Sequence, residues 1–294
     1  MHEPLPITVH EANLPDTRLR YAACGDGPPL IIVPATVSLI EDWTPMVQFL
    51  AGRYRTYFFE LPGHGGSTPL EGGFSSHKLA KVVGELADHL GHDRFTLLGF
   101  SFGGILTIRT LQLLGDRVEQ VALLSPCVSN RGLLRPPVDR AMIATVIATL
   151  KRRLPRRWLA WVLGNELAVR AVVWFMRDIG GFETTSDLRG RLSAFSESSL
   201  EVLVTQVHEI LTVTEEDLAG PYDVPCWFGM SVNDPLLDYA RSERFAKENF
   251  PDLEIERFQW PYHAPPEPLT YADYCRDFTH MRDVRVSLGT GSGI

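Results

Sequence analysis

Residues 97–106 read LLGFSFGGIL and place one serine between two apolar runs, with Gly99, Gly103 and Gly104 close to it. A side chain at such flanking positions would collide with nearby backbone wherever the chain turns very sharply. The glycine spacing therefore predicts a sharp turn centred on Ser101.

The residues on either side of this turn predict a strand before it and a helix after it. FTLLGF (95–100) is a short apolar run, which is typical of a buried parallel strand. The stretch 103–116 spaces its isoleucines and leucines along one helix face, and the periodicity stops at Gly115. A G-x-S-x-G pattern in this setting indicates a nucleophile elbow, which presents a serine hydroxyl beside a helix N-terminus. The alternative is a small residue in an ordinary turn, so the decision depends on possible partners of Ser101.

Length and composition favour one large α/β domain, because 294 residues with 45% apolar content can build a well-packed core. The net charge of −8 argues against nucleic-acid binding by the protein as a whole. Within residues 127–177, ten Lys or Arg face two acidic residues; this segment carries +8, which leaves −16 for the rest. We find no transmembrane segment and no signal peptide in the sequence, so we expect a cytoplasmic protein.

The four cysteines, Cys24, Cys127, Cys226 and Cys275, lie far apart in the sequence and form no C-x-x-C pair. Such spacing argues against a disulfide framework or a zinc site, and it predicts buried thiols.

Strand-like and helix-like segments alternate up to about residue 126 and again after about residue 219, which predicts a mostly parallel sheet flanked by helices. The expected strands are 6–12, 18–24, 29–35, 54–61, 95–100, 118–126, 225–232 and 253–259, and the expected helices are 42–53, 77–90, 103–116, 239–250 and 269–281, the last begun by Pro268.

Residues 127–218 have helical patterns throughout and interrupt the alternation. We interpret them as an inserted all-helical cap over the carboxyl edge of the sheet, where open α/β sheets bind ligands. The core would then consist of 1–126 and 219–286, followed by a flexible Gly/Ser tail at 287–294. An independent second domain is the alternative, and the return of the sheet pattern after the insertion disfavours it.

A serine nucleophile needs a base to remove its proton, and the base needs a carboxylate to orient it. Asp234 lies in NDPLL, directly after one late strand, and His263 lies in WPYHAPPEP, directly after the next. The alternatives are His64 as the base, Asp238 as the acid and His208 as a catalytic histidine. His64 lies in a glycine-rich turn, Asp238 suits a helix N-cap, and His208 fits a cap helix.

Four motifs together resemble the serine-type enzymes of the α/β-hydrolase fold: GFSFGG (99–104), ELPGHGGS (60–67), SVNDPLL (231–237) and YHAPPEP (262–268). The resemblance implies that Ser101 is the nucleophile, Asp234 the orienting acid and His263 the general base and later acid. Some families place the acid after the preceding strand, but residues 125–138 contain no Asp or Glu.

The resemblance also implies an oxyanion hole made by two backbone N–H groups, those of Phe102 and Thr36. Members of the family commonly carry His-Gly before the second donor, and this chain has Pro34 and Ala35 instead. Tyr262 stands where the family often has glycine. We expect Phe100 and Tyr262 to contact the substrate.

An aspartate at residue 101 would have indicated an epoxide hydrolase or haloalkane dehalogenase, and serine favours acyl chemistry. We expect a hydrolase of esters or thioesters of an apolar acyl group, with the apolar cap stretches 141–150, 158–163 and 171–176 lining the pocket. The triad needs no metal or organic cofactor. A C–C bond hydrolase or lyase with the same triad and a non-catalytic ligand-binding protein are the alternatives.

The basic run KRRLPRR (151–157) could meet the phosphates of coenzyme A, an acidic acyl carrier protein or an anionic membrane surface. A solvated face of the cap explains the same run without any partner.

Overall fold

The computed structural model describes residues 3–174, 195–265 and 267–278. Its centre is an eight-stranded sheet in the order β1-β2-β4-β3-β5-β6-β7-β8. β2 runs antiparallel to its neighbours β1 and β4, and every other neighbouring pair is parallel. The strands are β1 Thr8–Asn13, β2 Arg18–Cys24, β3 Pro29–Val33, β4 Arg55–Phe59, β5 Phe95–Phe100, β6 Val118–Leu124, β7 Cys226–Ser231 and β8 Leu253–Phe258.

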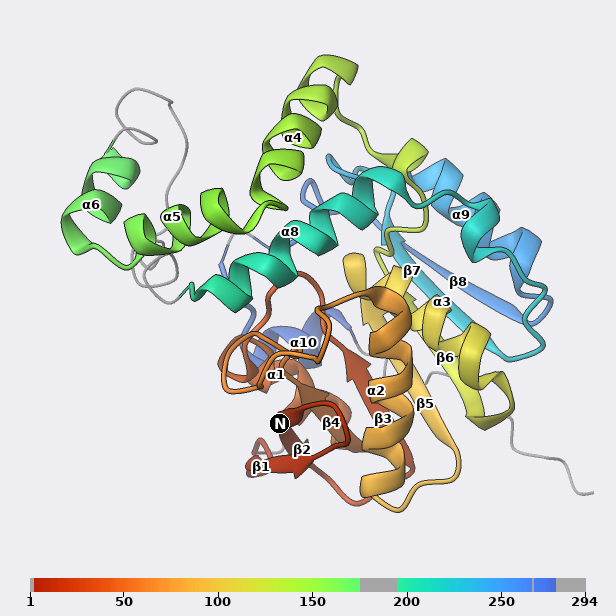
Figure 1. The fold of residues 1–294 in the computed structure, drawn as a ribbon. Coiled ribbons are helices and arrows are strands. Elements are labelled where there is room, and N and C mark those ends of the chain that lie inside the picture. The colour runs from red at the N-terminus through yellow and green to blue at the C-terminus, as the bar shows by residue number, and fades with distance from the viewer. Residues whose placement is uncertain (1–2, 175–194, 266, 279–294) are drawn as a thin grey trace, which may run out of the picture.

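Helices cover both faces of the sheet, so the predicted α/β architecture is confirmed (Figure 1). Adjacent strand residues point to opposite faces, as Ile31 and Ile32 of β3 show by belonging to two separate clusters of buried side chains. One cluster contains residues of α2 (Ser76–His89), α3 (Phe102–Leu114) and α9 (Tyr239–Asn249), and the other contains residues of α1 (Ile40–Leu50) and is flanked by α10 (Tyr271–Asp277).

The last helix begins later than Pro268. It starts at Tyr271, because Thr270 accepts a hydrogen bond from the N–H of Asp273 while the Asp273 carboxylate accepts one from the N–H of Thr270. This capping box satisfies the first free N–H groups of the helix, so the helix begins after Thr270 and not at the proline. The helix ends at Asp277, and the expected tail 287–294 lies outside the described residues.

The regular elements described in the insertion between β6 and β7 are helices, as expected for a cap, and loops join them. It contains a 3₁₀ turn at Asn130–Gly132, then α4 (Pro137–Leu150), α5 (Arg153–Leu163), α6 (Glu166–Trp174) and α8 (Glu197–Thr212), and another 3₁₀ turn at Glu216–Leu218. α4 and α5 contact α8, and α8 lies between them and the sheet domain (Figure 1). The cap therefore has an inner helix, α8, and an outer layer. Its limits at residues 127 and 218 stay a prediction.

The four cysteines, all of which lie within the described residues, form no disulfide. Cys24, Cys127 and Cys226 are buried as predicted, while Cys275 is half-buried. Burial raises the pKa of the Cys127 thiol to about 12, so this thiol is protonated at neutral pH.

Candidate active site

Ser101 lies between the end of β5 and the start of α3, with φ +54° and ψ −118°. A non-glycine residue seldom adopts such a positive φ. Hydrogen bonds hold the turn in place: the Ser101 N–H donates to the carbonyl of Leu124, and the Ser101 carbonyl accepts from the N–H groups of Gly104 and Cys127. The predicted sharp turn is therefore present.

The three glycines around Ser101 allow close approaches of other backbone segments. A Cβ on Gly99 would lie 2.4 Å from the carbonyl oxygen of Gly103, and one on Gly103 would lie 2.7 Å from that of Val33. A Cβ on Gly104 would lie 2.6 Å from Pro126. These approaches bring the end of β3 against the first turn of α3.

The structure brings the three predicted triad side chains together. The Nε2 of His263 lies 2.8 Å from the Oγ of Ser101, and its Nδ1 lies 2.7 Å from the Oδ2 of Asp234. Asp234 follows β7 and His263 follows β8, and parallel strands end at the same edge of the sheet. The ring of Phe100 stacks on that of His263, with centroids 5.4 Å apart.

Asp234 is buried and fully hydrogen-bonded. Burial would raise the pKa of its carboxyl, but the hydrogen bond and charge of His263 and the N–H groups of Leu236 and Leu237 outweigh that effect and lower the pKa. The two N–H groups donate to Oδ1 at 2.8 and 2.9 Å, which leaves Oδ2 for the imidazole. The carboxylate is therefore ionised at neutral pH and aimed at the ring.

The loop after β3 carries the predicted oxyanion donor. The N–H of Thr36 has no hydrogen-bond partner among the described residues. Phe102 is the first residue of α3, where N–H groups have no partner within the helix. Because Gly103 packs against the carbonyls of Val33 and Pro34, the loop lies beside the elbow.

Sequence reasoning missed Gln206. This fully buried side chain of α8 accepts a hydrogen bond from the Val37 N–H at 3.2 Å and donates one to the Ala35 carbonyl at 3.3 Å. It thus spans the two peptide groups on either side of Thr36, and Val37 has a positive φ of +28°. The sequence signal was a lone glutamine inside the apolar stretch LEVLVTQVHEIL (200–211).

The three alternatives to the triad residues have other partners or positions in the structure. Asp238 is the N-cap of α9 and accepts from the N–H of Arg241 at 3.1 Å, as predicted. His208 belongs to cap helix α8. His64 is buried under the cap, with its Nδ1 3.0 Å from the Oγ of Ser199 on α8.

Two aromatic side chains were expected near the substrate. Phe100 is half-buried and lies against both His263 and Trp43. Tyr262 is half-buried and stacks on Trp260, with ring centroids 6.0 Å apart. Their contact with substrate stays a prediction.

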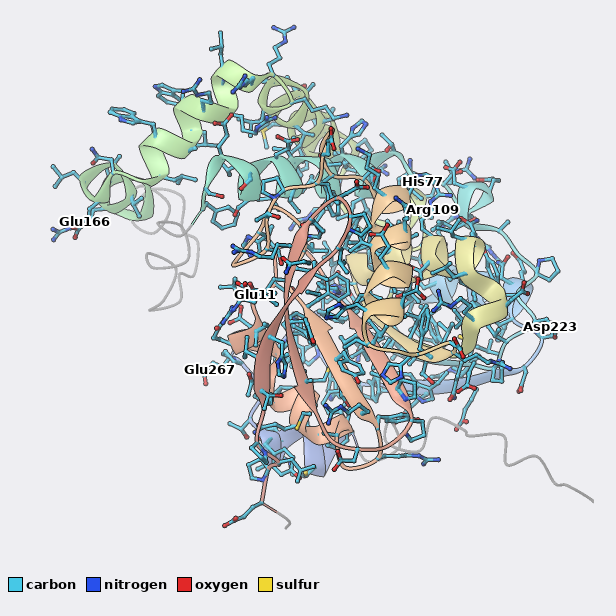
Figure 2. All side chains as sticks on the ribbon, turned by 60° about the horizontal axis from the view of Figure 1, so that its bottom comes forward. Glu11, His77, Arg109, Glu166, Asp223 and Glu267 are labelled. Carbon is cyan, nitrogen blue, oxygen red and sulfur yellow. The ribbon has the colours of Figure 1, made fainter. Side chains whose placement is uncertain are left out.

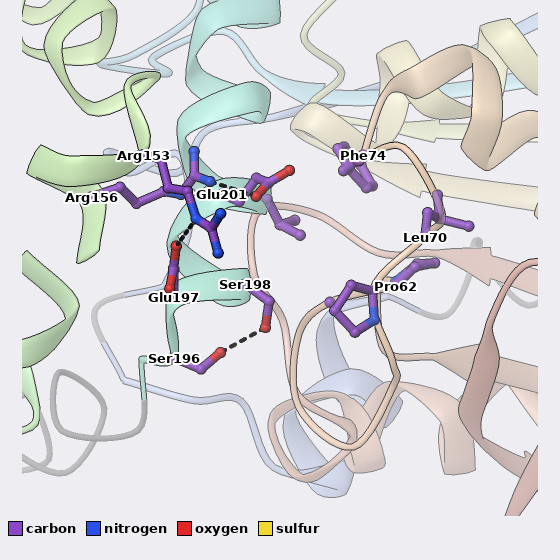
Figure 3. A pocket seen from close by; sticks show the side chains of 13 residues that line it. Pro62, Leu70, Phe74, Arg153, Arg156, Ser196, Glu197, Ser198 and Glu201 are labelled. Carbon is purple, nitrogen blue, oxygen red and sulfur yellow. Dashed lines mark hydrogen bonds and ion pairs between the residues drawn. The ribbon is translucent and has the colours of Figure 1, made fainter.

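A cavity of about 520 Å³ lies between residues 62–74 and the cap (Figure 3), and no triad residue lines it. Arg156 of the basic run reaches into it and pairs with Glu201 at 2.7 Å, so its side chain is only 12% exposed. Arg153 also lines the cavity but is 76% exposed, and Arg157 is 60% exposed. The basic run is therefore divided between the cap interior and the surface.

The expectation that the cap stretches line an apolar pocket is wrong for several residues. Met142 and Val146 of α4 and Trp158 and Trp161 of α5 are each more than half exposed. These helices pack on α8 with their other faces, since Ile147 and Leu163 are the buried ones. Residues 175 and 176 of the third stretch lie outside the described residues, as do the side chains of residues 172–174.

The comparison with protein families settles the kind of protein. The model of a family described as alpha/beta hydrolase fold matches residues 28–196, which is more than half of the chain. The chain belongs to this family. Within the described parts of this α/β hydrolase, no helix has the length and apolar character needed to cross a membrane.

Relatives of this α/β hydrolase include esterases. The pimeloyl-[acyl-carrier protein] methyl ester esterase of Nitrosomonas europaea is 26% identical over 213 residues, which are 69% of this chain and 82% of the relative. The soluble epoxide hydrolase of a Corynebacterium species is 29% identical over 118 residues, or 40% of this chain and 41% of the relative. A thermophilic esterase of Thermogutta terrifontis superimposes with a TM-score of 0.67 at 15% identity, covering 94% of this chain and 99% of the esterase, and this likeness concerns the fold alone.

Proposed function

We propose that this α/β hydrolase cleaves an ester of an apolar acyl group, with Ser101 as nucleophile, His263 as general base and Asp234 as orienting acid. The observation that carries the proposal is the continuous contact from Asp234 through His263 to Ser101, with distances of 2.7 and 2.8 Å at a strained elbow. Such an arrangement is recognised by its geometry.

In the proposed reaction the Oγ of Ser101 attacks the ester carbonyl while the Nε2 of His263 takes the hydroxyl proton. The ionised Asp234 stabilises the resulting imidazolium. His263 then gives the proton to the leaving alcohol, and an acyl group remains on Ser101. Water, deprotonated by His263, attacks this acyl-enzyme and releases the acid, which restores the serine.

The tetrahedral oxyanion would be bound by the N–H groups of Thr36 and Phe102. Support comes from the free N–H of Thr36, from the helix N-terminus at Phe102 and from the contact of Gly103 with the preceding loop. Gln206 would hold the Thr36 loop in place of the histidine-glycine pair that the family commonly has there.

Aromatic side chains beside the triad support an apolar acyl group. Phe100 lies between His263 and Trp43, and Tyr262 precedes His263 in the chain. The name of the Nitrosomonas europaea relative supports an ester rather than a carbon–carbon bond. Serine at residue 101 also favours acyl transfer over epoxide or haloalkane chemistry.

The deciding experiment treats the purified protein with a fluorophosphonate probe, which labels activated serines. We expect labelling of the wild type and none of Ser101→Ala. Ser125→Ala is the matched control. Ser125 also follows a strand of the sheet with a positive φ, it is buried, and within the described residues no hydrogen bond joins it to a histidine. An unlabelled but folded wild type would contradict the proposal.

A panel of aryl esters and acyl thioesters of increasing chain length then defines the substrate. We expect turnover that rises with chain length and that falls by about 10⁴-fold or more in Ser101→Ala. Labelling at Ser101 without turnover of any ester or thioester would favour the carbon–carbon bond chemistry instead.

A further inference from the structure

Helix α5 has apolar side chains on two opposite faces. Leu159 and Leu163 face inward and pack with Leu200 of α8. Leu154, Trp158 and Trp161 are 78%, 65% and 68% exposed. Their spacing of four and three residues puts these three on one side of the helix, and we call them the outer stripe.

Helix α4 carries an exposed apolar row of its own. Val138, Met142 and Val146 are exposed and follow one another at intervals of four residues, so they also share one helix face. α4 and α5 lie on the side of α8 that is away from the sheet (Figure 1). Glu166, the first residue of the next helix, α6, lies at one end of the cap (Figure 2). Single exposed apolar residues are ordinary, whereas a row with two tryptophans indicates a binding surface.

Cations flank the outer stripe. Arg153 and Arg157 are exposed. Measured as a rotation about the helix axis, their positions lie about 60–100° from the outer stripe. Lys151 and Arg152 are exposed directly before the helix. Residues 151–163 contain no acidic residue, and Glu197 of α8 approaches both flanking arginines only loosely, at 3.8 and 3.7 Å.

We propose that this surface docks the protein on an anionic lipid–water interface. Leu154, Trp158 and Trp161 would enter the boundary between headgroups and acyl chains, and the neighbouring arginines would meet lipid phosphates. Leucine and tryptophan on one face with arginine beside them is the pattern of an interfacial helix, and tryptophan suits the boundary because its ring is both apolar and polar.

Charge and burial favour this occupant over others. An acidic carrier protein or coenzyme A could pair with the arginines, but such polar contacts leave the stripe exposed to water. A second copy of the chain would bring one set of arginines toward another at a symmetric contact, which is unfavourable. An anionic lipid surface satisfies both the stripe and its cations.

The test is flotation of the full-length protein with vesicles of phosphatidylcholine alone or mixed with phosphatidylglycerol. We expect the wild type to float with the mixed vesicles and to float less as salt is raised, since salt screens the arginine contacts. Ser101→Ala should float like the wild type, which separates this proposal from the proposed catalytic function.

Two variants remove the stripe and its charges separately. Trp158→Ser with Trp161→Ser should lower vesicle binding by about tenfold or more, because it removes two large apolar side chains from the interface. Arg153→Gln with Arg157→Gln should lower binding to the anionic vesicles by about tenfold. Leu113→Ser and Arg94→Gln, two exposed residues outside the cap, are the matched controls and should bind like the wild type.

Three results would overturn the proposal. The first is a folded wild type that fails to float with either vesicle. The second is equal flotation of the wild type and the tryptophan double variant. The third is a stripe-dependent dimer, or a stripe-dependent complex with an acidic acyl carrier protein, in a protein that does not float.

Discussion

Ser101 is half-buried, and its place at the elbow costs backbone strain. A positive φ at a non-glycine residue costs of the order of 1–3 kcal/mol, and surrounding structure must hold it. Here the hydrogen bonds to Leu124, Gly104 and Cys127 do so, and Gly99 and Gly103 leave room for the turn. The result is a hydroxyl within hydrogen-bond distance of His263.

Asp234→Asn tests the orienting acid. We expect kcat to fall by about 10⁴-fold with little change in KM, because a neutral amide cannot stabilise the imidazolium and favours the wrong ring tautomer. Steady-state kinetics with an aryl ester measures both constants. Asp238→Asn is the control, since asparagine is also a good N-cap and activity should be kept. A loss of less than tenfold in Asp234→Asn would refute the role.

Gln206→Leu tests the link between cap and oxyanion loop. It keeps the size of the side chain but removes the bonds to Val37 and Ala35. We expect kcat to fall about 10–100-fold with KM nearly unchanged, because a misplaced donor acts mainly in the transition state.

A purely structural role for Gln206 would give a different result. The melting temperature would fall, and kcat per folded molecule would stay at the wild-type value. His208→Gln, on the same helix, is the control and should leave both quantities near wild type.

At the scale of elements, α8 joins the cap to the core. Ser199, Gln206 and Glu209 lie on this helix at intervals of seven and three residues, so they share one side of it. Ser199 contacts His64, and Gln206 contacts the loop after β3. Glu209 accepts a hydrogen bond from the N–H of Ser76, the first residue of α2. One helix face therefore connects the cap to three segments of the sheet domain.

The burial of His64 under the cap predicts a dependence of stability on pH. Burial lowers the pKa of His64 below its ordinary value of 6.5, although the charges of Glu60 and Asp42 and the Val37 backbone partly oppose this. Between the lowered pKa and 6.5 the unfolded chain binds more protons than the folded one. Stability should therefore be greatest above pH 6.5 and fall as the pH drops through this window.

Urea unfolding at a series of pH values measures the effect. His64→Gln should be less stable at neutral pH, but its free energy of unfolding should change less with pH between about 6.5 and the lowered pKa. His10→Gln is the exposed control. An unchanged slope in His64→Gln would contradict the assignment.

At the scale of the whole molecule, burial divides the sheet domain from the outer cap. Nearly every residue of β5 and β6 is buried, whereas α4 and α5 contribute one buried residue each, Ile147 and Leu163. Segments with few buried apolar contacts open without global unfolding. The outer cap should therefore open locally while the sheet stays folded.

Native-state hydrogen exchange followed by mass spectrometry tests this difference. Amides of α4 and α5 should exchange far faster than those of β5 and β6, with α8 between them because of its contacts to the core. Equal protection of α4 and β5 would mean that the cap and the sheet unfold as one unit.

Much of this fold could be predicted because its signals are local. The apolar run at 95–100 and the helical periodicity after Gly103 define a strand and a helix within a few residues of Ser101. Asp234 and His263 could be found because each directly follows a strand of a parallel sheet, and such strand ends meet at one edge. The start of α10 could not be placed, because Pro268 and the Thr270 cap give competing signals.

Periodicity and turn sterics depend on near neighbours in the chain, so the alternation of strands and helices, the turn at Ser101 and the three residues that meet there can be predicted from the amino acids alone. The folded chain is needed to see that Gln206 reaches the loop at Ala35, that Arg156 turns inward and that Trp158 and Trp161 point outward. A helix with two apolar faces does not specify which of them will be buried. That choice depends on where another helix, here α8, comes to pack.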